Sequence, residues 1–262
     1  MDVIVITGIS LGGIAFIAGI ILFISSRKFA VKENPMIDNV EELLPGANCG
    51  GCGYAGCRAF AEDLVNQKNT EIRCPVAGAE TMKAIAEMLG LKVDVSVRNV
   101  ARIMCQGGAH SLHEGKYLGI NACSAAVIGN TVDLVCPSGC LGYGDCAQAC
   151  PFDSIRMIRG LAVVDEDTCT GCGICIKTCP RQLIELVPYH KRVYVACKSA
   201  DKGADVKKYC SVGCIGCKLC EKACQFDAIE YKPFISRINP DKCTECMACV
   251  EKCPTKTILF RD

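Results

Sequence analysis

The sequence contains no tryptophan, only seven tyrosines and eight phenylalanines among 262 residues, and almost no net charge. So few aromatic side chains fit several small cores better than one large core. Lysine and arginine total 29 against 28 aspartate and glutamate residues, so the chain lacks the basic field expected of a protein that binds nucleic acid. It also lacks a P-loop and a dinucleotide-binding glycine fingerprint, and we therefore expect no flavin or nucleotide on this chain.

One long apolar run opens the chain. Val3–Ile24 has 22 residues without a charge, which is long enough to cross a bilayer as a helix. The run is not preceded by the basic residues that begin a secretory signal, so we predict an uncleaved transmembrane anchor over 1–26. Arg27 and Lys28 follow it, and the positive-inside rule then places the rest of the chain on the cytoplasmic side of the cell (inner) membrane, as a single-pass protein.

The chain has 24 cysteines, most of them in tight blocks. In a secreted protein they would indicate a disulfide scaffold, but cytoplasmic thiols stay reduced and are free to act as ligands. The clearest block is a C-x2-C-x2-C-x3-C-P run, which places three thiolates around one iron–sulfur cluster and sends the fourth to a neighbouring cluster. It comprises Cys169, Cys172, Cys175 and Cys179, and it recurs at Cys243, Cys246, Cys249 and Cys253 and, without the proline, at Cys214, Cys217, Cys220 and Cys224.

A glycine-rich segment, NCGGCGYAGC, precedes these blocks. It supplies Cys49, Cys52 and Cys57, and a fourth cysteine, Cys74, lies downstream. Three close ligands and one distant ligand fit a single cluster in a small domain over 46–92, after a polar linker over 27–45. A four-cysteine zinc site is the alternative, although zinc prefers two C-x2-C pairs. Helical periodicity predicts helices over 58–66 and 79–89.

The remaining chain contains an internal repeat. The segments 136–179 and 210–253 have equal length, and their first parts align without a gap. In this alignment Tyr143 occupies the position of the ligand Cys217, so the first segment lacks one cysteine. Cys136 is the obvious replacement for the missing ligand. We predict two ferredoxin-like units over 136–186 and 210–262, with an intervening segment over 93–135 and a connector over 187–209. Short strands are expected around 155–164 and 229–238.

The exchange of the fourth cysteine between neighbouring blocks predicts five [4Fe-4S] clusters. Cluster 1 takes Cys49, Cys52, Cys57 and Cys74. Cluster 2 takes Cys136, Cys140, Cys146 and Cys179, and cluster 3 takes Cys150, Cys169, Cys172 and Cys175. Cluster 4 takes Cys214, Cys217, Cys220 and Cys253, and cluster 5 takes Cys224, Cys243, Cys246 and Cys249. The fold class is then α+β, with an N-terminal transmembrane helix, a small helical four-cysteine domain and two bacterial-ferredoxin-like 2[4Fe-4S] units.

Four cysteines are left over: Cys105, Cys123, Cys197 and Cys210. A sixth cluster would need all four to converge from distant positions, and nothing in their spacing demands it. Free buried thiols behave as small apolar side chains, and we favour that interpretation.

The order of these parts resembles a known family. One anchor, then LPGANCGGCGYAGC with Cys74 downstream, then ferredoxin-type blocks, is similar to the B subunit of the Rnf complex, the membrane-bound ferredoxin:NAD+ oxidoreductase that moves sodium ions or protons. The two ferredoxin-like units and the intervening segment correspond to its long, clostridial type.

The resemblance implies an electron-transfer component without a complete active site of its own. Such a component would accept electrons from reduced ferredoxin and pass them to membrane subunits of the Rnf complex, whose other members are the A, C, D, E and G subunits. Two other classes remain open. One is a polyferredoxin component of a different membrane redox enzyme, which would differ only in its partners. The other is a non-catalytic redox sensor or scaffold, which would need an output domain that the sequence does not offer.

Overall fold

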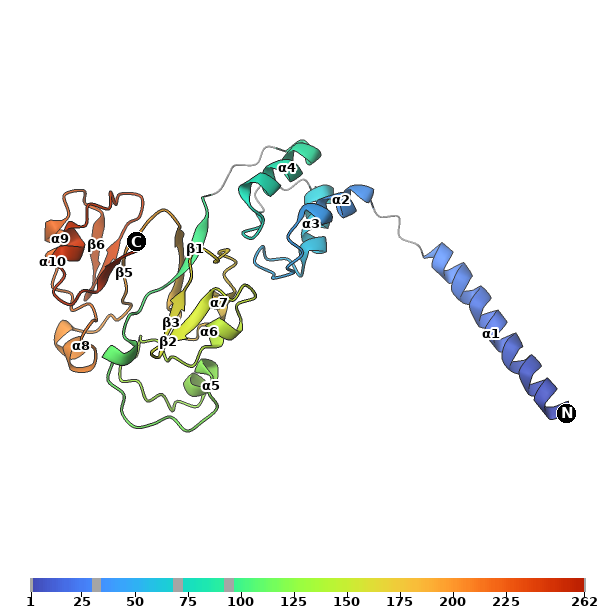
Figure 1. Cartoon of the computed structure of the whole chain (residues 1–262), viewed down its shortest axis with the longest axis horizontal. Helices are drawn as coiled ribbons and strands as arrows, with labels where there is room; N and C mark the ends of the chain where they lie inside the picture. Colours follow the sequence, from blue (N-terminus) through green and yellow to red (C-terminus); the bar gives the residue numbers. More distant parts are fainter. Residues whose placement is uncertain (1, 30–33, 68–72, 92–96, 262) are drawn as a thin grey trace.

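A long apolar helix precedes the rest of the fold. The computed structural model describes residues 2–29, 34–67, 73–91 and 97–261 of the chain. Its first helix, α1 (Asp2–Lys28), includes the segment Ile6–Lys28, whose length and mean hydropathy of 2.3 suit a membrane span. Large apolar side chains such as Phe16 and Ile17 are exposed along it, and the helix lies apart from the other elements (Figure 1). The predicted anchor over 1–26 therefore falls on a helix whose apolar surface needs a nonpolar environment.

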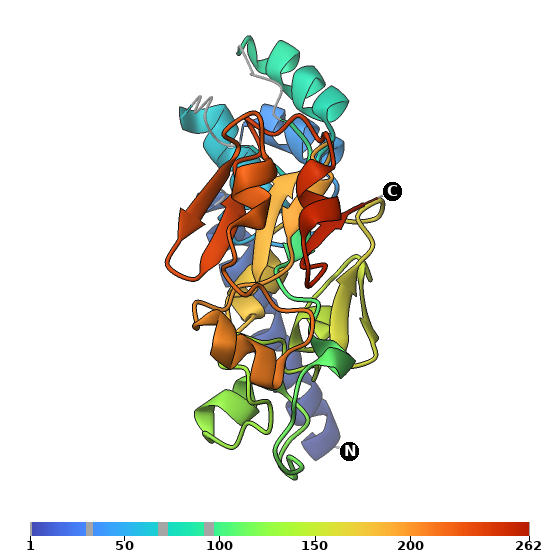
Figure 2. The ribbon, with the colours of Figure 1, turned by 90° about the vertical axis from the view of Figure 1, so that its left-hand side faces the viewer.

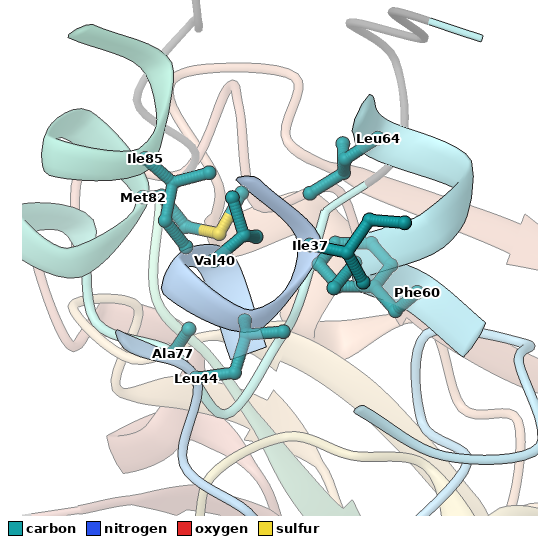
Figure 3. Close-up of a cluster of buried hydrophobic side chains, with 9 residues drawn as sticks. Ile37, Val40, Leu44, Phe60, Leu64, Ala77, Met82 and Ile85 are labelled. Atoms are coloured by element: carbon teal, nitrogen blue, oxygen red, sulfur yellow. The ribbon is translucent and has the colours of Figure 1, made fainter. Parts of the chain in front are cut away.

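Three short helices, α2 (Pro35–Leu43), α3 (Cys57–Gln67) and α4 (Ala79–Leu89), form a small domain after the anchor. Figure 3 shows the core that these helices share. Its buried members are Ile37, Val40, Leu44, Phe60, Ala61, Leu64, Ala77, Met82 and Ile85. The helices predicted over 58–66 and 79–89 are confirmed, and α2 is an addition to them.

Helix α2 occupies the second half of the predicted linker over 27–45. In the sequence Asn34 and Pro35 suggest a chain break, but in the structure they start a helix. The side-chain oxygen of Asn34 accepts a hydrogen bond of 3.0 Å from a backbone N–H two residues on, and Pro35 occupies the first turn, where its missing N–H is not needed. Val40 of this helix is fully buried in the core, so the small domain begins earlier than the predicted range 46–92.

Two units of the same topology follow, each built from two pairs of short strands and two short helices (Figures 1 and 2). The first contains β1 (Asn99–Ile103), α6 (Asp145–Gln148), β2 (Ile155–Ile158), β3 (Leu161–Val164), α7 (Ile174–Thr178) and β4 (Ile184–Pro188). The second contains β5 (Val193–Val195), α9 (Leu219–Ala223), β6 (Ile229–Lys232), β7 (Ile235–Ile238), α10 (Ala248–Lys252) and β8 (Ile258–Phe260). The hairpins β2–β3 and β6–β7 confirm the short strands predicted around 155–164 and 229–238.

Each unit is closed by a strand that comes before its first cysteine block. Strand β1 pairs antiparallel with β4, and β5 pairs in the same way with β8. The predicted unit boundaries therefore differ from the structure, because β1 falls in the intervening segment 93–135 and β5 in the connector 187–209. Strands of three to five residues contain too few positions for an alternating pattern to reveal them.

The segment between β1 and the first cysteine block packs against both units. It contains a 3-10 turn, η1 (Gly108–His110), and the short helix α5 (Cys123–Ile128). Apolar side chains from this segment, from the first block and from helix α8 (Gly203–Tyr209) form one buried cluster. Its members are Cys123, Ala126, Leu134, Cys136, Leu141, Val206 and Tyr209. The cluster joins the first unit to the helix that leads into the second unit.

A buried ionic group also ties the two units together. Glu166, which follows β3, accepts two hydrogen bonds of 3.0 Å from Arg102 of β1, and it accepts a third, of 2.6 Å, from Arg261, which follows β8. The side chain of Arg102 is 2% exposed and that of Glu166 is 9% exposed. Arg261 also pairs with Asp167 at 2.9 Å, so two carboxylates balance the two guanidinium groups and hold the end of the second unit against the first.

We expect Glu166→Gln to destabilise the protein strongly. Glutamine keeps the size of the side chain but leaves the buried Arg102 without its counter-charge, whereas Arg261 keeps its ion pair with Asp167. Removal of one partner from a buried ion pair costs about 3–5 kcal/mol. The measurement is the denaturant midpoint of the purified full-length chain, followed anaerobically by circular dichroism. Lys208→Gln is the control, since Lys208 and Asp205 form an exposed pair, and it should cost less than about 1 kcal/mol. Equal midpoints for the two variants would contradict the role of Glu166.

Candidate iron–sulfur centres

All 24 cysteines lie in the part of the chain that the structure describes, as free thiols without a disulfide among them. Within the same ranges, no three His, Cys, Asp or Glu side chains converge closely enough to hold one metal ion. The thiols are instead arranged in groups of four. Zinc holds its sulfur ligands about 2.3 Å from a single point, whereas the ligands of a [4Fe-4S] cluster bind separate iron atoms and can surround a larger cavity.

In the second unit two cavities are each lined by four cysteines. One, with about 340 Å³ of empty space that is partly open to solvent, is lined by Cys214, Cys217, Cys220 and Cys253, which we call quartet 4. The other, of about 330 Å³, is lined by Cys224, Cys243, Cys246 and Cys249, which we call quartet 5. The structure thus brings together the residues predicted for clusters 4 and 5, including the cysteine that each block sends to the other.

The first unit has two corresponding cavities. One, of about 320 Å³, is lined by the residues predicted for cluster 3, namely Cys150, Cys169, Cys172 and Cys175, which we call quartet 3. The other, of about 410 Å³, is lined by Cys123, Cys140, Cys146 and Cys179, which we call quartet 2. Quartet 2 differs from the set predicted for cluster 2 at one position, because Cys123 stands in place of Cys136.

Asp145 fixes Cys123 in quartet 2. Its carboxylate accepts hydrogen bonds from the backbone N–H groups of Cys123 at 2.6 Å and Ser124 at 3.0 Å, which attaches the first turn of α5 to the start of α6. Burial acts to raise the pKa of Asp145, but these N–H groups outweigh burial and the pKa is lowered. The carboxylate therefore stays charged, and it holds Cys123 close to Cys146, the next residue of α6.

Tyr143 explains why quartet 2 takes a distant ligand. This residue occupies the position of Cys217 in the second unit, but its ring packs on Tyr117 with ring centroids 5.2 Å apart. Its hydroxyl donates a hydrogen bond of 3.1 Å to Asp133. Both contacts are to the segment that carries Cys123. Tyr143, which replaces a cysteine of the block, thus helps to hold the segment that supplies Cys123 to quartet 2. No block spacing could have revealed this, because Cys123 lies outside every block.

Cys136 lies elsewhere. Its thiol is close to those of Cys105, Cys197 and Cys210, the three cysteines that remain outside the quartets. Cys136 is part of the buried cluster with helix α8, and this packing places it on the side of the first unit that faces the second. The structure therefore places Cys123, and not the predicted Cys136, at the cavity of quartet 2.

In the small domain the four residues predicted for cluster 1 come together. These are Cys49, Cys52, Cys57 and Cys74, which we call quartet 1; the last three pack against the domain core, and the charges of the first two lie near the Cys74 thiol. Asn48 shapes the loop, since its side-chain oxygen accepts a hydrogen bond of 2.8 Å from the Cys57 N–H. A Cβ on Gly56 would lie 2.7 Å from that oxygen, so glycine at this position leaves room for the hydrogen bond.

Backbone N–H groups point at sulfur atoms in several quartets. They include Ala101 to Cys169 at 3.4 Å, Leu183 to Cys179 at 3.5 Å, Thr257 to Cys253 at 3.3 Å and Ala77 to Cys74 at 3.4 Å. Burial acts to raise the pKa of Cys253, but its N–H donors outweigh burial and lower it, whereas burial raises the pKa of Cys146 and Cys175 to about 12. Such hydrogen bonds stabilise thiolates and tune reduction potentials. Four thiols around each cavity, with N–H donors to sulfur in quartets 2, 3 and 4, fit the ligation of a [4Fe-4S] cluster.

Three family models match the chain where these quartets lie. A model described as a putative Fe-S cluster matches residues 44–76, which contain quartet 1. A 4Fe-4S binding domain matches 161–184, and a 4Fe-4S dicluster domain matches 213–257. The matches show several iron–sulfur domains in this chain.

Relatives match almost the whole chain. It is 44% identical over 253 residues to the B subunit of the ion-translocating oxidoreductase complex of Methanosarcina acetivorans, with 96% of each chain covered. It is 41% identical to the B subunit of the Na(+)-translocating ferredoxin:NAD(+) oxidoreductase complex of Acetobacterium woodii, over 95% of this chain and 75% of the relative. The chain belongs to this B-subunit family. The proton-translocating counterpart of Clostridium ljungdahlii is 40% identical over 94% of this chain and 88% of its own length.

Membership of the B-subunit family confirms the resemblance seen in the sequence. The matched regions extend over the intervening segment and both units, as expected for the long type. The chain is thus one component of an oxidoreductase complex, and its iron–sulfur domains suit electron transport.

Proposed function

We propose that this chain receives electrons from reduced ferredoxin and passes them along its cysteine quartets to membrane subunits of an ion-translocating ferredoxin:NAD+ oxidoreductase. The order of the quartets carries the proposal, because neighbouring quartets adjoin one another within each unit and between the first unit and the small domain. When bound, a [4Fe-4S] cluster accepts and releases one electron. The residues of the chain hold the clusters in sequence, shield them from water and set their potentials through hydrogen bonds to sulfur.

The small domain meets the first unit where quartets 1 and 3 lie. A Cβ on Gly51 would be 2.9 Å from the carbonyl oxygen of Cys172, so the close approach of the two loops depends on glycine. Burial raises the pKa of the Cys172 thiol, and the nearby charge of Cys49 raises it further. Quartet 1 therefore adjoins quartet 3.

Within each unit the two quartets share a helix pair. Cys146 of quartet 2 and Cys175 of quartet 3 belong to one buried cluster, on the neighbouring helices α6 and α7. Cys220 of quartet 4 and Cys249 of quartet 5 are related in the same way on α9 and α10. Each unit thus provides two adjacent positions for an electron.

Exposure favours the second unit as the entry point. Cys217 of quartet 4 and Cys246 of quartet 5 are exposed, whereas the other 22 cysteines are buried or half-buried. A ferredoxin that docks on the second unit could therefore reach an exposed cysteine of quartet 4 or of quartet 5. Quartet 1 lies nearest the anchor in the sequence, and we therefore place the exit to the membrane subunits there.

The side of the membrane and the further partners belong to the same proposal. Arg27 and Lys28 end helix α1, and by the positive-inside rule these two basic residues support a cytoplasmic position for the iron–sulfur domains. The exit partners are then found among the A, C, D, E and G subunits of the complex, which carry the flavins and the NAD site.

The proposal is tested with the purified full-length chain in detergent, loaded with iron and sulfide under anaerobic conditions. Reduced ferredoxin should bleach the visible absorption of the clusters, because it meets exposed quartets of the second unit. NADH alone should leave the absorption unchanged, since the NAD site lies on another member of the complex. Bleaching by NADH but not by ferredoxin would place this chain at the other end of the pathway and refute the proposal.

A further inference from the structure

The four cysteines outside quartets 1 to 5 form two matched pairs, and each pair has one cysteine from each unit. The first pair follows the closing strands: Cys105 comes two residues after β1 and Cys197 two residues after β5. The strands are held in the same register, since the N–H before each cysteine donates to an equivalent carbonyl, Met104 to Leu183 at 2.7 Å and Ala196 to Thr257 at 2.9 Å. Cys105 and Cys197 therefore occupy equivalent places in the two units.

The second pair opens the first block of each unit. Cys136 and Cys210 each precede the next cysteine of the block by four residues. Their sulfur atoms lie against equivalent glycines, because a Cβ on Gly139 would be 3.4 Å from the Cys136 sulfur and one on Gly213 would be 3.5 Å from the Cys210 sulfur. Local geometry thus directs these two thiols in the same way.

The two pairs meet where the units are in contact. Backbone hydrogen bonds cross the interface from Leu112 to Tyr209 at 2.7 Å and from Ser211 to His110 at 3.2 Å, and Ser111 forms a β-bridge with Cys210. The side-chain amide of Gln106, next to Cys105, donates to the carbonyls of Val212 at 3.2 Å and Lys256 at 2.8 Å. Cys136 and Cys210 also pack in the same buried cluster.

The surroundings of these thiols match those of the other quartets. The Gly107 N–H donates to the Cys105 sulfur at 3.3 Å, and the Ser111 hydroxyl lies 3.7 Å from the Cys210 sulfur. The Cys136 thiol lies close enough to those of Cys105, Cys197 and Cys210 for their charges to act on it, so three sulfurs are near a fourth. A group of lone apolar thiols would have no need of N–H donors aimed at sulfur.

We propose that Cys105, Cys136, Cys197 and Cys210, which we call the interface quartet, bind a sixth [4Fe-4S] cluster shared by the two units. Each unit supplies two ligands, so the cluster is complete only when the units are docked. With it, all 24 cysteines have a place in six quartets.

The position of the interface quartet gives it a role that rests on the proposed function. Cys105 packs in the same cluster as Cys140 of quartet 2, and Cys197 in the same cluster as Cys214 of quartet 4. The interface quartet therefore lies between the two units, and the full order becomes 5, 4, interface, 2, 3 and 1. Without it, an electron that enters the second unit has no intermediate site on the way to the first.

Iron and acid-labile sulfide are counted in the purified full-length chain, loaded anaerobically, with folded chains counted separately by native mass spectrometry. The wild-type chain should hold about 24 irons, since each of six clusters holds four. The double variant Cys105→Ala/Cys197→Ala should hold about 20, and the addition of Cys136→Ala should cost no further iron, because all three substitutions affect one cluster. Ser199→Ala, which changes a buried residue beside Cys197 without removing a thiol, is the control and should keep the wild-type count.

Two outcomes overturn the proposal. A wild-type count of about 20 irons, unchanged in the double variant, would show that the four cysteines are buried thiols. A further loss of about four irons on addition of Cys136→Ala would place Cys136 in another cluster. If some molecules of a variant fail to fold, native mass spectrometry still gives the iron content of the folded molecules. These counts do not depend on ferredoxin or NAD. The presence of a sixth cluster is therefore tested independently of the proposed function, and either one can be refuted without the other.

Discussion

Replacement of Cys49 by alanine should reduce ferredoxin-driven NAD+ reduction by the assembled complex to the level seen without this chain. The substitution removes a ligand from quartet 1, the proposed exit from the chain, while the other quartets keep all their thiols. The measurement is NADH formation from reduced ferredoxin in membranes that carry the variant complex. Glu42→Gln, an exposed change in the same domain, is the control and should leave the rate unchanged.

The same variant locates quartet 1 in the electron path. In the isolated Cys49→Ala chain, reduced ferredoxin should still bleach most of the cluster absorption, because entry through the second unit does not involve quartet 1. Unimpaired NAD+ reduction by the variant complex would show that the exit lies elsewhere. Loss of bleaching by ferredoxin would instead make quartet 1 the entry point and reverse the proposed direction.

Replacement of Cys123 by alanine should remove up to about four irons from the full-length chain, because quartet 2 then lacks one of its four thiols. Iron and sulfide counts and the electron paramagnetic resonance spectrum report the loss, including the signal of a three-iron cluster if only one iron leaves. If the Cys123→Ala chain kept its full iron content, the ligand of cluster 2 would be Cys136, as the sequence predicts.

A second substitution should restore the lost cluster. Tyr143→Cys completes a C-x2-C-x2-C-x3-C-P run that includes Cys140 and Cys146. The first block of the second unit has the same spacing of four cysteines, but without the final proline. The Cys123→Ala/Tyr143→Cys chain should therefore recover the iron content of the wild type. Tyr143→Cys alone should leave the count unchanged, which separates rescue from a general effect of an added thiol.

The ligand sets that could be predicted are those in which sequence spacing fixes spatial spacing. In quartets 3, 4 and 5, three cysteines lie within seven residues of one another, and the fourth comes from the end of the paired block. A turn of that length can surround only one cluster, so the spacing of the cysteines is enough to predict which of them share a cluster. The small domain is similar, because the loop from Cys49 to Cys57 needs only one distant partner.

The predictions from the sequence differ from the structure where a residue type is compatible with two local arrangements. Asn34 and Pro35 suggest a break, yet the same pair caps and begins α2. Cys136 is the nearest cysteine to a block that lacks a ligand, yet proximity along the chain does not set the direction of a side chain. Its packing with α8 turns it toward the second unit, and Asp145 brings in Cys123 instead.

The sequence by itself determined the chemistry: the apolar first segment, cysteines in the spacing of iron–sulfur ligands, the internal repeat of the cysteine blocks and the family. These follow from local composition and spacing, which any fold of the chain must respect. Only the tertiary structure decided the partners of Cys105, Cys123, Cys136, Cys197 and Cys210. Their approach depends on how β1 and β5 close their units and how the units dock, and such contacts between distant segments leave no periodic trace in a single sequence.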